Sequence, residues 1–197
     1  MKSMFFIAVL IIFQASLPVS RDIKASDSIC LSSEEKKLYD LMMAYRKSKG
    51  LEPIELSAKL TQVAQLHAHD LADHYKFDPK NRCNPHSWSS KGKWSSCCYT
   101  NDPKKAELEC MWNKPKEIAG YNSLGYEIAY YSSAGASASE GLDGWKKSPF
   151  HNPLIVNDGT WSKVKWKAIG IGFYKEYGVV WFGELEDTSP IQLCANP

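Results

Sequence analysis

The sequence predicts an α+β domain in which helices come first and strands follow. Capped, amphipathic segments occupy residues 32–50 and 57–71. Two runs rich in β-branched and aromatic residues, 166–174 and 179–184, lie in the last third and are joined by a polar connection. Helices followed by an antiparallel hairpin are typical of an α+β layered domain.

Residues 1–20 have the order of a secretory signal peptide. Lys2 precedes the apolar run 4–13, and the small residues Ala15 and Ser16 follow it. The run is shorter than the roughly 20 residues that a membrane-spanning helix needs. We therefore expect a secreted, extracellular protein without a transmembrane anchor, and a single domain over residues 30–197.

The charge pattern gives no sign of a nucleic-acid partner. The formal net charge is +2, and Lys and Glu residues are interspersed along the chain. Such a chain lacks the basic footprint that nucleic-acid binding requires. We expect a monomer that binds no nucleic acid.

All six cysteines follow the signal-like segment, and an even number in a secreted chain indicates three disulfides. A bridge between the adjacent Cys97 and Cys98 would be strained, and chain ends often lie close together. The favoured pairing therefore joins Cys30 to Cys194, while Cys83 and Cys110 each take one of the adjacent pair; other pairings stay open. A zinc site is disfavoured, because the cysteines lack the Cys-x2-Cys spacing of structural zinc.

The first helix begins at a capping box. Ser32 can accept a hydrogen bond from the amide of Glu35, whose side chain can reach back. Leu38 and Met42 recur at helical spacing, and Gly50 suits the end of the helix.

A second helix follows Ser57. Its apolar stripe consists of Leu60, Val63, Ala64, His67 and Leu71. We interpret His67 as a hydrogen-bonded core histidine. His69 is expected at the surface, because side chains two positions apart on a helix do not face each other.

The middle of the chain predicts a loop and two shorter helices. Residues 75–101 are polar, aromatic and rich in cysteine, and we expect a disulfide-rich insertion at about 83–110. Asp102 and Pro103 predict a short helix to about residue 112. A second capping box, from Ser137 to Glu140, opens a helix that ends before Pro149.

Three glycines inside the predicted strands, Gly170, Gly172 and Gly183, indicate close approach by neighbouring elements. We expect Trp145 and Trp181 in the core.

Several short motifs follow one another in a specific order between about residues 38 and 184. They are Leu-x-x-x-Ala-x-x-His at 60–67, His-Ser at 86–87, Gly-x-Glu-Ile at 125–128, Trp-x-x-Ser-Pro-x-His-x-x-x-Ile at 145–155, Ile-Gly-Ile-Gly at 169–172 and Trp-Phe-Gly at 181–183. In this order the chain resembles the CAP superfamily, which contains cysteine-rich secretory proteins, antigen 5, plant pathogenesis-related class 1 proteins and other SCP-like extracellular domains.

The resemblance implies a three-layer α-β-α sandwich with a central antiparallel sheet. It also implies a cleft lined by two histidines and one or two carboxylates. By position, His86 and His151 would be the histidines and Glu127 the glutamate.

The chain departs from the family pattern around this cleft. Tyr126 separates the motif glycine from the site glutamate, and Ile128 replaces the usual asparagine. The second family glutamate falls on Ser148. Glu140 and Asp143 are nearby candidates to replace it, although the capping box explains Glu140 more simply.

Two histidines and a carboxylate can bind zinc, transfer protons near neutral pH, or shape a polar groove. We expect no required cofactor, although His86 and His151 could bind Zn²⁺ in the cleft. No Ser-His-Asp or Cys-His set accompanies them, so no catalytic residue is assigned.

We therefore expect a protein that acts mainly by binding through His86, Glu127 and His151. The resemblance suggests a lipid or sterol, an envelope component or another extracellular protein as the partner. The alternatives are a metal-dependent hydrolase that uses the same three residues, and a structural or adhesive extracellular protein.

Overall fold

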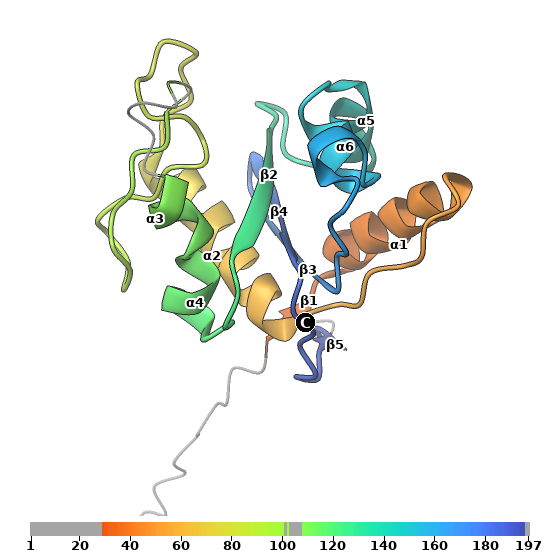
Figure 1. The fold of residues 1–197 in the computed structure, drawn as a ribbon. Coiled ribbons are helices and arrows are strands. Elements are labelled where there is room, and N and C mark those ends of the chain that lie inside the picture. Colours follow the sequence, from red (N-terminus) through yellow and green to blue (C-terminus); the bar gives the residue numbers. More distant parts are fainter. Residues whose placement is uncertain (1–28, 101, 103–107, 196–197) are drawn as a thin grey trace, which may run out of the picture.

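The computed structural model describes residues 29–100, 102 and 108–195, and the expected signal peptide lies outside them. The described chain forms three layers, with a central sheet between two groups of helices (Figure 1). The α+β class and the antiparallel central sheet are confirmed. Within the described residues, no helix is long and apolar enough to cross a membrane.

The central sheet has three antiparallel strands in the order β2-β4-β3. They are β2 (Gly125–Tyr131), β3 (Ala168–Tyr174) and β4 (Tyr177–Gly183). Strands β3 and β4 form the predicted hairpin, which turns at Lys175 and Glu176. Strand β4 is paired on both sides, and β2 lies at an edge of the sheet.

Helices cover both faces of this sheet (Figure 1). One group contains α2 (Ala58–His74), α3 (Leu108–Trp112) and α4 (Lys114–Ala119). The other contains α1 (Ser33–Ser48), α5 (Ala138–Lys147) and α6 (His151–Ile155). A 3-10 turn, η1 (Gly159–Trp161), and a short parallel pair, β1 (Cys30–Leu31) with β5 (Gln192–Leu193), complete the described elements.

The first two helices begin at the predicted caps. Ser32 and Glu35 form a reciprocal capping box at the start of α1. The hydroxyl of Ser57 accepts from the amide of Leu60 at 3.0 Å. Helix α1 ends just before Gly50, which adopts a left-handed φ of 73°. Local sequence therefore sets the starts of both helices and the end of α1.

The helix start at Ser137 differs in part from the prediction. Ser137 accepts from the amide of Glu140, but among the described contacts the Glu140 carboxylate does not return to the cap. It lies instead 3.4 Å from the hydroxyl of Tyr130. The expected start of the short helix after Asp102 lies outside the described residues, and its described part is α3, which ends at Trp112 as predicted.

Strand β4 separates the interior into two cores. Val180 and Phe182 pack with α1, α5 and α6, whereas Val179 and Trp181 pack with α2. All four side chains are fully buried. Side chains alternate along a strand, so one central strand contributes to both cores. Trp145 of α5 is buried in the first core, as the sequence predicted.

Helix α2 packs directly on β3 at two glycines. A Cβ at Gly170 would overlap the α2 backbone at Leu60, and one at Gly172 would overlap it at Ala64. A Cβ at Gly183 would overlap a tyrosine ring. The predicted close approaches are therefore confirmed, and they fix how near α2 lies to the sheet.

The three disulfides have the favoured pairing. Cys30–Cys194 joins β1 to the chain beside β5, across a sequence separation of 164 residues. A loop of that length contributes about 5 kcal/mol in the chain-entropy model of disulfide stabilisation. Cys83–Cys98 and Cys97–Cys110 span only 15 and 13 residues. We refer to residues 83–100, which these two bonds hold, as the braced loop.

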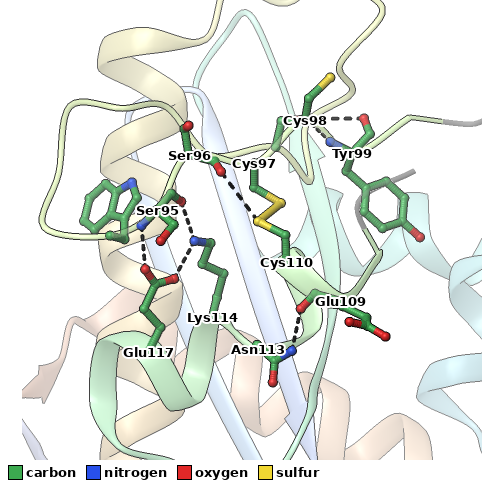
Figure 2. The surroundings of a disulfide bond; sticks show 12 residues. Ser95, Ser96, Cys97, Cys98, Tyr99, Glu109, Cys110, Asn113, Lys114 and Glu117 are labelled. Carbon is green, nitrogen blue, oxygen red and sulfur yellow. Dashed lines mark hydrogen bonds and ion pairs between the residues drawn. A yellow bond between two sulfur atoms is a disulfide. The ribbon is translucent and has the colours of Figure 1, made fainter. Parts of the chain in front are cut away.

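Figure 2 shows how the braced loop is fixed beside α3 and α4. Cys97 of the loop is bonded to Cys110 of α3. Lys114 is fully buried, and its ammonium donates to the Ser95 carbonyl and, at 2.5 Å, to the Glu117 carboxylate. The amide of Ser95 donates to the same carboxylate. The buried cation thus has both an opposite charge and a hydrogen-bond acceptor, which compensates its loss of water.

Replacing Gly172 with Ala should destabilise the domain by about 1–3 kcal/mol, because the added Cβ would push α2 away from β3. Gly144→Ala is the matched control, since its Cβ would meet only the Tyr130 ring, at 3.8 Å or more. Urea unfolding of both variants gives the comparison. A Gly172→Ala protein as stable as the wild type would contradict the close packing.

Candidate binding cleft

Glu127 is the acidic residue at the centre of the candidate site. It lies in β2 directly opposite Trp181 of β4, which packs in the core against α2. Directly opposite residues on paired strands point to the same face of a sheet, so Glu127 also faces α2. Its side chain is fully buried. A carboxylate in this position needs partners from the protein to offset its loss of water.

His67 of α2 supplies the first partner. Its Nδ1 lies 2.5 Å from Oε2 of Glu127, and its Nε2 lies 3.0 Å from the carbonyl oxygen of Ser87. The imidazole is fully buried and stacks on the ring of Trp88 at a centroid distance of 4.0 Å. The prediction of a hydrogen-bonded core histidine is confirmed, and the neighbouring His69 is exposed as expected.

His86 of the braced loop supplies the second partner. Its Nδ1 lies 2.7 Å from Oε1 of Glu127. The backbone amide of His86 donates to Oδ1 of Asn84 at 3.0 Å, which fixes the turn that presents the imidazole. The Tyr99 ring meets the imidazole edge-on. One carboxylate therefore joins a helix, a loop and a strand.

The loop itself is attached to α2. The carboxylate of Asp70 accepts from the amide of Ser89 at 2.8 Å and also from its hydroxyl. The Trp94 indole N–H donates to the Ser89 carbonyl at 3.0 Å, and its ring packs edge-on against Trp88. These tryptophans form a local core beneath the loop, which sets the position of His86.

The partners of the two imidazoles define where the protons lie. Burial alone would raise the pKa of Glu127, but the charge of His67 and the hydrogen bonds from both imidazoles outweigh it and lower the pKa. The carboxylate therefore accepts from both rings. The Ser87 carbonyl can only accept, so Nε2 of His67 donates to it. His86 donates from Nδ1, and its Nε2 has no partner among the described residues.

His151 is the first residue of α6. Its amide and that of Phe150 both donate to the Ser148 hydroxyl at 3.3 Å. Burial, helped by the nearby charge of His86, lowers the pKa of His151 to about 4. The His151 ring is therefore uncharged near neutral pH.

The three residues singled out from the sequence, His86, Glu127 and His151, line one pocket of about 390 Å³, which we term the cleft. Its other lining residues are mainly aromatic or apolar: Asn84, Tyr99, Met111, Trp112, Tyr126, Phe150, Leu154 and Trp161. Because β2 is an edge strand, side chains from both of its faces reach this pocket.

The sequence offered two nearby candidates to replace the second family carboxylate, and for Glu140 it favoured a role in the helix cap instead. Glu140 and Asp143 do not line the cleft, and among its described lining residues Glu127 is the one acidic side chain. Asp143 lies 3.5 Å from Lys146, on the surface of α5. The additional partner of Glu127 at the site is His67, which sequence reasoning assigned only to the core.

The donor set of the cleft does not fit a three-ligand zinc site. Both carboxylate oxygens of Glu127 accept from imidazoles, which leaves only His86 and His151 as nitrogen donors. Within the described ranges, no three His, Cys, Asp or Glu side chains are grouped to hold a metal ion. Zinc sites use three or four protein ligands, so no chemical step is assigned to a metal.

The stability of the protein should fall as the pH drops from about 6.5 towards 4, partly because of His151. Its pKa is lowered in the folded state, so the unfolded chain binds more protons in this interval. His151→Gln should flatten this part of the profile, whereas His69→Gln should not. Urea unfolding at several pH values tests this. An unchanged profile in His151→Gln would show that the ring is not held uncharged.

Removing the Cys83–Cys98 bond by paired Cys→Ala substitutions should loosen the first cleft histidine before the core. Amides of residues 84–99 should exchange about tenfold faster, the effect of roughly 1.4 kcal/mol of local stability. Amides of β3 and β4 should change little. The matched control removes Cys30–Cys194. Hydrogen exchange read by mass spectrometry would contradict the idea if residues 84–99 kept their protection.

Comparison with known proteins identifies the family. A model of the cysteine-rich secretory protein (CAP) family matches residues 39–181. No curated protein gives a significant match. A cysteine-rich secretory protein from Staphylococcus aureus shares the fold, with 16% identity over 77% of this chain and a TM-score of 0.51. An extracellular protein containing an SCP domain, from Bacillus anthracis, shares it with 18% identity over 77% and a TM-score of 0.53.

The chain spans 38% and 40% of those two structures, so the likeness concerns one part of each. At these identities it shows the fold alone. The family model, however, covers well over half of the chain and includes the helix pair, the braced loop and most of the sheet. The chain therefore belongs to the cysteine-rich secretory protein (CAP) family.

Proposed function

We propose that this chain is an extracellular CAP-domain protein that acts mainly by binding an apolar ligand, such as a lipid or sterol, in its cleft. The composition of the cleft carries the proposal. Aromatic and aliphatic side chains form most of the wall, and His86, Glu127 and His151 provide a few polar groups. Ligand pockets commonly have this combination, because apolar walls supply affinity and polar groups fix orientation.

The side chains at the opening of the cleft support the proposal that a ligand enters from solvent. Phe150 lines the cleft and is 82% exposed, so a large apolar surface lies beside the opening. Tyr126, inserted relative to the family pattern, packs on Trp161 and Trp166 and completes the wall.

Disulfides and family membership support the extracellular location. All six cysteines are paired, and disulfides of this kind persist in oxidising compartments. Both structural relatives are described as secretory or extracellular proteins. An envelope component or another extracellular protein is the second class of partner that such a domain could bind.

The metal-dependent hydrolase is the alternative that the site supports less well. It would need Glu127 free to act on a metal or a water, yet both of its oxygens are held by imidazole N–H groups. The expected zinc ligands His86 and His151 give two donors, one fewer than a catalytic zinc site uses.

The purified protein should retain lipid or sterol after incubation with a mixed panel of fatty alcohols, fatty acids, sterols and phospholipids. His151→Ala should retain several-fold less, because the variant loses a polar group of the cleft. His69→Ala is the control, since this histidine is exposed on α2. Mass spectrometry of extracted ligand gives the readout. Equal retention by all three proteins, or none by the wild type, would exclude ligand binding in the cleft.

Zinc titration of the wild type, His86→Ala and His151→Ala tests the metal-dependent hydrolase. Clearly weaker zinc binding in both variants would favour the hydrolase over ligand binding. Equal zinc affinity in all three proteins would exclude the hydrolase.

A further inference from the structure

A second pocket lies beside the end of β2 and is separate from the cleft. Its volume is about 490 Å³, and its described lining residues include none of those that line the cleft. Tyr131, the last residue of β2, belongs to this lining and follows Glu127 by four residues. Four residues of strand span about 13 Å, so one strand contributes to two distinct sites.

Two adjacent aromatic rings form an exposed part of the pocket wall. The rings of Phe77 and Tyr131 stack at a centroid distance of 4.6 Å and are nearly parallel, and Tyr131 also contacts the ring of Tyr177. Phe77 is 42% exposed and Tyr131 is 36% exposed, whereas Tyr177 is buried. Exposed apolar side chains that stand singly are common, but an exposed pair beside a pocket indicates a binding surface.

Hydrogen bonds in the segment after α2 hold these rings in place. The side-chain amide of Asn81 donates to the Lys76 carbonyl at 2.7 Å, which closes the loop that carries Phe77. The hydroxyl of Tyr177 donates to the Tyr75 carbonyl at 3.3 Å, which attaches the start of this segment to the sheet. The rings are therefore positioned before a ligand arrives, which reduces the entropy lost on binding.

Polar groups of both kinds lie around the rings. The lining includes the carboxylate of Glu176, the ammonium of Lys76 and the hydroxyl of Ser133. Among the described residues, none of these three side chains has a hydrogen-bond or ion-pair partner. The pocket thus offers both donors and acceptors to a ligand.

The charges around the pocket balance. Asp73 also lines it, and its carboxylate is paired with the ammonium of Lys175 at 2.8 Å. The charges of Glu176 and Lys76 are opposite, and His74 is counted as neutral. An organic cation could stack on the rings, but Lys76 and Lys175 would repel it. The pocket therefore favours a ligand without net charge.

We propose that this pocket binds a neutral glycan, with one sugar ring stacked on Phe77 and its hydroxyl groups bonded to Glu176, Lys76 and Ser133. A sugar ring with equatorial substituents presents C–H groups on both faces, and the negative face of an aromatic ring attracts them. Its hydroxyl groups both donate and accept, which matches the polar groups of the lining. The inference goes beyond the proposed function of the cleft and does not depend on it.

Depletion of the protein from solution by insoluble chitin, cellulose and β-1,3-glucan tests the proposal. The wild type should bind at least one of these polymers, and soluble oligosaccharides of the same polymer should compete. Phe77→Ala should bind about tenfold more weakly, because it loses the stacking ring, whereas Phe77→Trp should retain binding. Leu185→Ala is the matched control, since Leu185 is 45% exposed and does not line the pocket.

Two further measurements separate glycan recognition from unspecific adsorption. Glu176→Ala should weaken binding several-fold, because a sugar hydroxyl loses its acceptor. Raising the salt concentration should change the affinity little, since the ligand is uncharged. Circular dichroism checks that each variant is folded. The proposal is wrong if no polymer binds the wild type, if Phe77→Ala binds as tightly as the wild type, if Leu185→Ala loses as much binding as Phe77→Ala, or if salt releases the protein.

Discussion

The carboxylate of Glu127 holds together three segments that the chain separates widely. His67 lies 60 residues before it and His86 lies 41 residues before it, yet both donate to its two oxygens. A buried carboxylate loses its hydration, and only well-placed partners offset that loss. Strand β2, helix α2 and the braced loop must therefore meet in one arrangement. The glycine contacts between α2 and β3 hold the helix close enough to the sheet for this to happen.

The sheet allows the site and the cores to coexist. The side chains on the two faces of the central strand β4 are buried in two apolar cores. None of them is available for a polar site. Strand β2 is paired only with β4 and leaves its other edge open towards the braced loop and α6. The polar residue Glu127 and the aromatic Tyr126, which point to opposite faces, can thus line the same cleft. The site lies where the sheet ends.

Local patterns predicted most of the scaffold, and the order of motifs predicted the lining of the cleft. Ser32, Ser57 and the β3–β4 hairpin are recognisable because caps and strands depend on neighbouring residues. The sequence does not predict the contact of His67 with Glu127, because this contact depends on which turn of α2 lies opposite Glu127 in β2. Glu140 and Asp143 lie near the motif in sequence, but on α5 they lie beside Tyr130 and Lys146 and do not line the cleft.

The two short disulfides of the braced loop have an evolutionary consequence. Cys97 and Cys98 are adjacent but bond in different directions, so each bond encloses its own small ring of chain. These bonds hold the segment together with its contacts to Asp70 of α2 and Lys114 of α4. Its interior residues can then vary, and with them the outline of the cleft, while α2, the sheet and α1 keep their packing. New ligand preferences could arise in this family by exchange of one crosslinked segment, without remaking the scaffold that carries it.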